Sequence, residues 1–302
     1  MKRFLILASV ALLSAWISGA AELSARMDGK KLLVEVDGRL FTAYCFDAGQ
    51  KYPYFYPVNG PLTGESVTTE TSEPYPHHHS LFFGCDRVNG GNYWQDKNET
   101  GQIFSRGPEI VQAKGDAVVI RDRCDWKRPG ADQPLEDART VTITAPAPDR
   151  RVIDFEITLT PLMDVKIEKT NHSLFSARMT PALSEKGGGT LVNAEGGAAE
   201  AGTFGKASPW CDYFGVRDGK TEGLAILQHP GNPWYPATWF TRDYGFFSPT
   251  PMYWPANDQF TELPKGKPVT LRYRVVVHAG DTDKEDIAGA FAAWSGTGDK
   301  KP

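Results

Sequence analysis

Apolar and polar residues alternate along many segments of this chain, with the period of two that is typical of half-buried β-strands. The clearest example is the segment 151–161, where Ile153, Phe155, Ile157 and Leu159 alternate with mostly polar residues. Comparable patterns predict further strands at residues 31–36, 39–46, 109–111, 117–126, 139–145, 165–178, 210–216, 223–228 and 269–277. Many short strands of this kind favour antiparallel sheets.

Two local signals complete the prediction of the fold. Asp37-Gly38 separates two expected strands and indicates a tight hairpin turn, because both residues tolerate a positive φ. In the segment 281–294 the apolar residues recur at helical spacing, with Asp281 or Thr282 as the cap. The sequence therefore predicts an all-β protein: a large antiparallel β-sandwich with one C-terminal helix, formed as a single domain over residues 21–302.

Two segments are expected to lie outside the sheets. Residues 51–61 are rich in proline and aromatic residues. Proline cannot donate a ladder hydrogen bond, so we expect a segment at the rim of the fold and not a central strand. Residues 186–205 are rich in glycine and poor in bulky side chains, which predicts a long irregular loop.

The first twenty residues have the pattern of a secretory signal peptide. Lys2 and Arg3 precede an apolar run over residues 4–17, and the small residues Ser18-Gly19-Ala20 follow it. This run is shorter than the roughly 20 residues that span a bilayer. We therefore expect cleavage after Ala20, export to the periplasm or the medium, and no membrane association afterwards.

Charge and cysteine content argue against several partners and sites. A formal net charge of −4 without a basic run argues against binding to nucleic acid or anionic membranes. The four cysteines show no CxxC spacing, which argues against a zinc or redox site. An exported chain could pair them in three ways, but Cys45 and Cys85 lie in apolar runs that favour buried free thiols. The oligomeric state stays open.

The stretch 74–94 contains the densest group of chemically active residues. His77, His78 and His79 stand directly before the apolar run 81–83, which predicts a core strand. Side chains alternate between the two faces of a strand, so His77 and His79 are expected on one side and His78 on the other. Three imidazoles beside a core strand favour a functional role, because histidine titrates near neutral pH.

General acid–base catalysis is the chemistry that suits these residues best. His77, His78 and His172 are the predicted catalytic residues, although a purely structural role stays open for His172 and for His229. The carboxylates that could orient them are Asp86, Glu222 and Asp243. The chain has no G-x-S-x-G motif and no phosphate-binding loop. Adjacent histidines alone do not converge on a metal ion, so neither a metal site nor a cofactor is predicted.

Aromatic residues in proline- and glycine-rich stretches indicate where a substrate binds. The chain has eight tryptophans, and an exposed indole is a flat platform for a sugar ring. Trp94, Trp234, Trp239 and Trp254 are the ones expected on a cleft. Arg242 is either half of a surface ion pair or an anchor for a carboxylate or hydroxyl group. The predicted substrate-binding residues are Asp86, Asn89, Trp94, His229, Trp234, Trp239 and Arg242.

Five blocks of the sequence resemble one bacterial family. They are KYPYFYPV, PHHHSLFFGCDRVNGGNYW, TEGLAILQHPGNPW, FTRDYGFFSPTPMYW and LRYRVVVHAGD. Proteins with these blocks are often labelled methane oxygenase PmoA, and the resemblance covers nearly the whole chain after residue 20. Pro76, His77 and His78 match the family's histidine block, whereas His79 falls on a variable position.

The resemblance implies an all-β carbohydrate-associated protein, similar in size to the galactose mutarotase supersandwich. It does not imply methane oxidation. The methane-oxidising subunit of that name spans the membrane several times, and this chain shows no apolar run of that length after residue 20.

The sequence thus predicts a secreted protein that acts on a sugar or glycoside by histidine acid–base chemistry, as an isomerase, hydrolase or lyase. Its partner would be a small molecule or an oligosaccharide. A non-catalytic sugar-binding protein is the first alternative, and a metal-dependent oxidoreductase or lyase is the second. An enzyme would bury its histidines in a deep cleft with an acid within reach, whereas a binding protein would present tryptophans on a shallow face.

Overall fold

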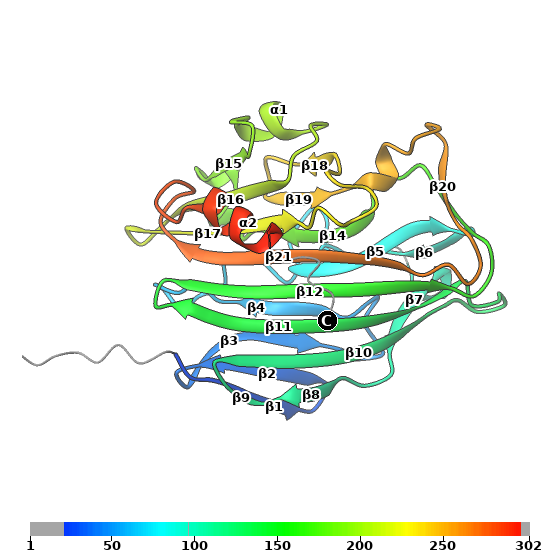
Figure 1. Cartoon of the computed structure of the whole chain (residues 1–302), viewed down its shortest axis with the longest axis horizontal. Coiled ribbons are helices and arrows are strands. Elements are labelled where there is room, and N and C mark those ends of the chain that lie inside the picture. The colour runs from blue at the N-terminus through cyan, green and yellow to red at the C-terminus, as the bar shows by residue number, and fades with distance from the viewer. Residues whose placement is uncertain (1–20, 96, 297–302) are drawn as a thin grey trace, which may run out of the picture.

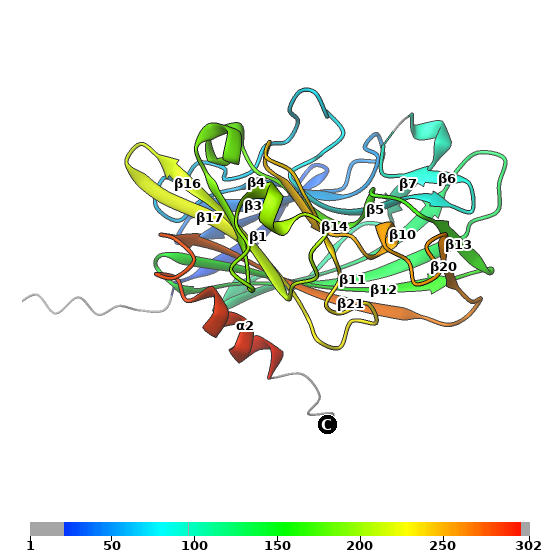
Figure 2. The same cartoon turned by 90° about the horizontal axis from the view of Figure 1, so that it is seen from above.

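The computed structural model describes residues 21–95 and 97–296, so the proposed signal peptide at residues 1–20 lies outside the described residues. Two antiparallel sheets pack face to face over the described part (Figure 1 and Figure 2). The antiparallel sandwich predicted from the alternating pattern is therefore confirmed, and so is the helix near the C-terminal end.

The first sheet contains twelve strands within the described residues. Its main path runs through β18 (Trp239–Thr241), β19 (Phe246–Pro249), β14 (Ser173–Arg178), β5 (Leu81–Val88), β4 (Tyr54–Val58), β3 (Arg39–Cys45), β2 (Lys31–Val36), β1 (Leu23–Asp28) and β9 (Lys114–Gly115). Three further strands attach beside β5: β6 (Gly91–Tyr93) and β13 (Val165–Glu168) pair with β5, and β20 (Phe260–Leu263) pairs with β13.

The second sheet contains nine strands in the part that the structure describes. Its path runs through β15 (Thr190–Asn193), β16 (Trp210–Arg217), β17 (Lys220–Gln228), β21 (Val269–Ala279), β12 (Arg150–Pro161), β11 (Leu135–Ala147), β10 (Ala117–Lys127) and β7 (Gln102–Ser105), and β8 (Glu109–Gln112) pairs with β10. The strand predicted at residues 151–161 is β12, and it lies near the middle of this sheet.

Apolar side chains from both sheets interlock in the space between them. Phe83 and Phe175 come from the first sheet, and Phe155 and Tyr273 come from the second. The ring of Phe155 lies 4.9 Å from that of Phe175, which lies 4.8 Å from that of Tyr273. All four side chains are buried. The odd-numbered residues of β5 and β14, such as Phe83 and Phe175, face the core. The even-numbered residues therefore face away from the second sheet.

The helical segments are short and lie outside the sheets. They are η1 (Asn98–Thr100), η2 (Pro181–Leu183), η3 (Glu185–Gly187), α1 (Ala199–Thr203), η4 (Pro251–Tyr253) and α2 (Ile287–Ser295). Helix α2 packs on the outer side of the second sheet, where Ile287 joins a small apolar cluster with Trp210 (Figure 2). The predicted cap was wrong. Asp286 caps α2 by accepting from the Gly289 N–H at 2.9 Å, while the Thr282 hydroxyl is engaged elsewhere.

The prediction that residues 51–61 lie at the rim was also wrong. Strand β4 sits between β3 and β5 in the first sheet, despite Pro57. The register with β3 shifts here, so that Thr42 faces Val58 and Tyr44 faces Phe55. Pro57 therefore falls in the irregular part of the ladder, where no hydrogen-bond donor is required.

Two further segments differ from the prediction. The continuous strand expected over residues 165–178 is broken into β13 and β14, which leaves His172 in the bend directly before β14. Residues 186–205, expected to form an irregular loop, contain β15 and the short helix α1. The isolated bridge between Val192 and Ala198 folds this segment back on itself, so a sequence rich in glycine still makes defined contacts.

A charged network is buried between the sheets. Arg139 pairs with Asp137 at 2.8 Å, and both side chains are almost completely buried. The Trp126 indole N–H also donates to Asp137, and the Tyr44 hydroxyl donates to Asp122, each at 2.8 Å. Burial raises the pKa of the Tyr44 hydroxyl and of the Asp122 carboxyl. Because each charge has a partner, this network is a structural element of the core.

All four cysteines are buried free thiols, as the apolar runs around Cys45 and Cys85 indicated. None of the helices in the described residues is long and apolar enough to cross a membrane.

Candidate functional site

The loop that carries the histidines is anchored on both sides of β5. The Tyr52 hydroxyl donates to the His77 carbonyl oxygen at 2.5 Å, and the Tyr52 ring stacks on Phe82 at 4.6 Å. The hydroxyls of Thr68 and Ser80 lie 2.7 Å apart. The loop is therefore fixed to the outer face of the first sheet by buried contacts, which positions its side chains before any ligand binds.

His77 and His78 lie together, contrary to the alternation expected from a strand. Their ring centroids are 4.4 Å apart. Strand β5 begins only at Leu81, and Ser80 has a positive φ of 57°, so residues 77–80 turn instead of alternating. His79 points elsewhere, with its ring 5.0 Å from that of Tyr54.

The antiparallel register of β5 and β14 brings His172 next to Asp86. Ser173 is paired with Cys85, so the preceding His172 and the following Asp86 face each other. The His172 Nδ1–H donates to Asp86 Oδ2 at 3.0 Å. A carboxylate on Nδ1 fixes the tautomer and leaves Nε2 as the nitrogen that can accept a proton.

This dyad faces the histidine loop. The ring of His77 lies 6.2 Å from that of His172, and the indole of Trp94 lies 5.8 Å from it. The side chain of His172 is 25% exposed, whereas that of Asp86 is almost buried. Three of the predicted site residues outside the loop, Asp86, His172 and Trp94, are thus brought to one place with His77 and His78.

His78 is held as a neutral imidazole. It is buried, and its ring stacks on that of Phe246 at 4.4 Å. Burial lowers the pKa of His78 well below its ordinary value, and the neighbouring His77 and Arg178 lower it further. At neutral pH it can therefore donate and accept hydrogen bonds without carrying charge. His78 is thus packed among aromatic rings and does not lie open to solvent.

Arg178 is a member of this site that the sequence did not reveal. It ends β14, is 2% exposed, and its guanidinium lies 4.3 Å above the ring of Tyr244. Tyr75 lies 5.0 Å from Tyr244 and is 38% exposed, so these two rings form the outer edge of the cluster. An arginine at the end of an otherwise apolar strand is a possible signal, but its surroundings come from three distant segments.

Buried polar atoms without a hydrogen-bond partner are concentrated in this cluster. Within the described residues they include Nδ1 of His78, Oδ1 of Asp86, Nε1 of Trp94, and Nε and Nη1 of Arg178. Such atoms are uncommon in folded proteins, because each costs free energy when it is removed from water. Their accumulation at one place marks a site that a polar ligand would complete.

Three predicted binding residues have structural roles elsewhere. Trp239 is completely buried and its indole N–H donates to the Ser208 carbonyl, so it belongs to the core. Asn89 lies in the turn after β5, where its side chain donates to the Asp164 carbonyl at 3.0 Å. The imidazole of His229 is 5.1 Å from Trp294, beside α2.

The remaining predicted partners are also bound away from the histidines. Arg242 forms an ion pair with Glu200 at 3.1 Å and lies over two phenylalanine rings. Glu222 is buried and accepts hydrogen bonds from the backbone of residues 62 and 63. Asp243 pairs with Lys186 at 3.1 Å. Trp94 and Trp239 are buried, so the expectation that they line an open cleft was wrong.

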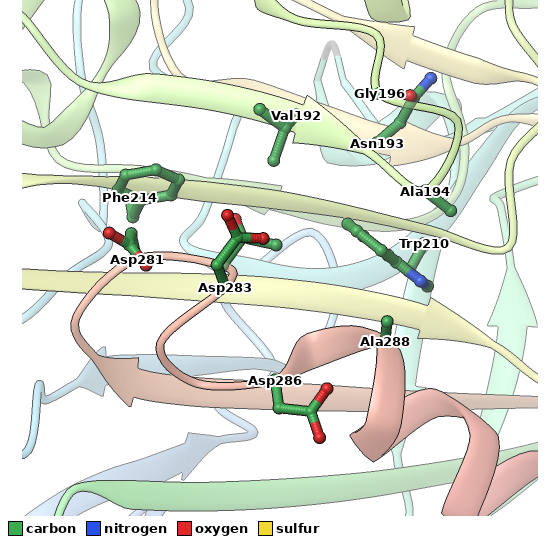
Figure 3. Close-up of a pocket in the computed structure, with 11 residues that line it drawn as sticks. Val192, Asn193, Ala194, Gly196, Trp210, Phe214, Asp281, Asp283, Asp286 and Ala288 are labelled. Carbon is green, nitrogen blue, oxygen red and sulfur yellow. The ribbon is translucent and has the colours of Figure 1, made fainter.

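Among the cavities of the described residues outside the histidine cluster, two have tryptophan in their lining. One of about 510 Å³ is lined by aromatic residues that include Trp234, Tyr235, Trp254 and Phe260. Trp234 and Trp254 therefore line a cavity, whereas their role in binding a substrate stays a prediction. In the other, of about 550 Å³, Asp281 and Asp283 extend from the loop before α2, while Trp210 lines the other end (Figure 3). No group of three or more histidine, cysteine or acidic side chains in the described residues has a metal-binding arrangement.

Comparison with solved structures finds weak similarity to sugar-processing proteins. The chain is similar to galactose 1-epimerase from Lactobacillus acidophilus, with a TM-score of 0.39, 8% identity, and coverage of 86% of this chain and 98% of the epimerase. A protein assigned as a kojibiose phosphorylase from the human microbiome gives a TM-score of 0.37 at 9% identity over 84% of this chain. A polysaccharide lyase gives 0.31 at 11% identity over 88% of this chain. The chain spans about a third of the length of these last two, 32% and 34%.

Comparison with curated proteins finds no match. Residues 31–292 match a family of unknown function, DUF6807. Nothing in that match links the chain to PmoA or to methane oxygenase, so the resemblance inferred from the five sequence blocks was wrong. The chain belongs to the family of unknown function DUF6807.

Proposed function

We propose that this protein is an enzyme that transfers protons to and from a sugar substrate at the histidine cluster. The observation that carries the proposal is the Asp86–His172 pair, at 3.0 Å, directed toward His77. A structural histidine needs one hydrogen bond, whereas a catalytic one needs an orienting partner on one nitrogen and an accessible second nitrogen. Asp86 is the orienting partner of His172, and the 25% exposure of the His172 side chain leaves its second nitrogen accessible.

Each histidine of the cluster has a separate role in the proposed acid–base catalysis. His172 acts as the general base through Nε2, because Asp86 holds the proton on Nδ1 and stabilises the imidazolium that forms. His77 stands across from it and supplies the general acid. His78, which stays neutral, offers a hydrogen bond that orients a substrate hydroxyl.

Aromatic surfaces support a sugar as the substrate. Tyr75, which is exposed, and the half-buried Tyr244 lie at the outer edge of the histidine cluster. The cavity of about 510 Å³ combines Trp234 and Trp254 with the polar side chain of Asn257. Aromatic faces with polar groups at their edges suit the apolar face and the hydroxyl groups of a sugar ring. This cavity would hold a part of the substrate that does not react.

We also propose that the protein acts outside the cytoplasm. The basic start, the apolar run over residues 4–17 and the small residues before Ala21 support this proposal. Amino-terminal sequencing of the protein recovered from its natural host tests it. A mature chain that begins at Ala21 is expected, and an intact Met1 in the cytoplasmic fraction would contradict export.

The catalytic proposal is tested with a library of free sugars, glycosides and oligosaccharides, analysed by NMR for isomerised, hydrolysed or eliminated products. His172→Gln should decrease the rate of any reaction found by about 10²–10⁴-fold, which is typical for loss of a general base. His229→Gln is the matched control, because His229 lies beside α2 and outside the cluster. Binding without turnover by the wild-type protein would support the alternative, a non-catalytic sugar-binding protein.

A further inference from the structure

Arg178 differs from the other buried arginine of the described residues in one respect. Arg139 and Arg178 are each 2% exposed. Arg139 has a carboxylate partner, Asp137, at 2.8 Å. Arg178 forms no ion pair with any acid in the described part, and its Nε and Nη1 are buried without a hydrogen-bond partner. A buried guanidinium without a counter-charge is costly, so its retention calls for an explanation.

Tyrosine rings surround Arg178, and no acidic side chain of the described residues forms an ion pair with it. The groups nearest to its charge are Tyr244, Tyr213, Tyr75 and His78. Burial raises the pKa of Tyr244 to about 12, so this hydroxyl is neutral and does not compensate the guanidinium. The Tyr213 hydroxyl is occupied, because it accepts from the Glu185 N–H at 2.7 Å. Among the described residues, no acidic side chain compensates this charge, which leaves room for a counter-charge supplied by a ligand.

We propose that Arg178 binds a carboxylate group of the substrate, which makes the ligand an acidic sugar such as a uronic acid or its oligosaccharide. The inference rests on the proposed function of the histidine cluster for the nature of the ligand. A guanidinium presents donors in a planar fork that matches a carboxylate. A single buried guanidinium suits a singly charged carboxylate better than a doubly charged phosphate.

The position of Arg178 indicates where this carboxylate lies. Arg178 ends β14 and His172 lies in the bend directly before it, so their backbones are at most roughly 20 Å apart. His78 lies between them: its ring is 4.4 Å from that of His77, which faces His172, and 6.5 Å from that of Tyr244, over which Arg178 lies. The carboxylate would thus be bound at a distance from the reacting group, so an acidic oligosaccharide should bind better than a single acidic sugar.

The test compares an acidic oligosaccharide with its neutral ester, and a sugar phosphate is added as a doubly charged ligand. Binding of oligogalacturonide, of its methyl ester and of galactose 6-phosphate is measured by calorimetry with the wild-type protein. The acid should bind roughly 30-fold or more tightly than the neutral ester, which is the effect expected for one desolvated charge pair. Arg178→Met should remove that preference, while Arg26→Met, a substitution of an exposed arginine, should keep it.

The possible outcomes separate this inference from the proposed function. Equal binding of acid and ester, tighter binding of the phosphate, or no binding of any of the three ligands overturns the carboxylate assignment, whether or not Arg178→Met folds. If the carboxylate assignment fails but His172→Gln abolishes turnover of a neutral sugar, the catalytic proposal is still supported. If the acid is preferred but no substrate is turned over, the carboxylate site stands and the catalytic proposal fails.

Discussion

Replacing each of the two buried arginines by methionine should have opposite effects on stability. Methionine is apolar and unbranched, so it fills much of the space of the arginine side chain while removing the charge. Arg139→Met leaves the Asp137 carboxylate buried without its cation. Arg178→Met removes a charge that has no carboxylate partner in the described residues.

The magnitudes follow from what each arginine contacts. Breaking a buried ion pair by removing one partner costs about 3–5 kcal/mol. Arg139→Met should therefore lower the melting temperature by about 6–20 °C for a chain of this size. Removing Arg178 loses its contact with the Tyr244 ring, which is worth about 2 kcal/mol for a desolvated cation. It also relieves a desolvation cost of several kcal/mol, so the melting temperature should stay unchanged or rise.

Thermal and urea unfolding of the wild-type protein and the two variants measure this difference. A decrease for Arg178→Met as large as that for Arg139→Met would show that Arg178 stabilises the fold through partners of its own. The reasoning that assigns it to ligand binding would then be refuted. An increase in stability together with loss of binding to an acidic sugar would be the expected signature of a functional residue.

Three further predictions concern other parts of the fold. Asp86→Asn should shift His172 away from the Nδ1–H tautomer, as seen in ¹⁵N NMR, and should decrease any rate by about 10²–10⁴-fold. Burial opposes protonation of His278, but the Asp212 carboxylate at 2.9 Å outweighs it and raises the pKa of His278. The resulting stabilisation is fully present below the ordinary histidine pKa of about 6.5 and is lost as pH rises through the folded value. His278→Gln should therefore lower the melting temperature more at about pH 5.5 than at about pH 9, and an equal decrease at both would contradict this. Phe82→Ala should cost about 3–5 kcal/mol in urea unfolding, because Phe82 is buried in β5, and a cost below about 1 kcal/mol would show that the site collapses without a cavity.

Local patterns predicted much of the fold because local chemistry determines it. The turn between β2 and β3 has positive φ at Asp37 (51°) and Gly38 (73°), as the dipeptide indicated. The alternation along β12 placed it in the sheet with one face buried. Strand β4 was missed because the rule against proline in central strands has an exception at register shifts. Such a shift depends on the neighbouring strand, so residues 51–61 alone could not reveal it.

The sequence identified some residues of the site and missed others, and this difference has a physical cause. Side chains that carry chemistry by themselves, such as His77 and His172, can be recognised by type. Arg178 becomes informative only through what surrounds it, and its neighbours come from the histidine loop and the segment before β19. Sequence could not separate buried tryptophans from tryptophans that line a cavity, for a related reason. Composition shows that an indole is available, but only the packing shows that Trp239 is buried in the core while Trp234 lines a cavity.

The β5–β14 ladder connects the fold to the proposed chemistry. At one end the ladder stops at the pair Ser173–Cys85, and the next two residues are His172 and Asp86. At the other end it stops at the pair Ala177–Leu81, and the next residue of β14 is Arg178. A slip of one residue in this register would turn these side chains to the core face of the sheet. Apolar packing between the sheets opposes such a slip, because it would also expose the core-facing residues. The buried core that stabilises the sandwich thus also fixes the distance between the dyad and the arginine, and with it the length of ligand that can reach both.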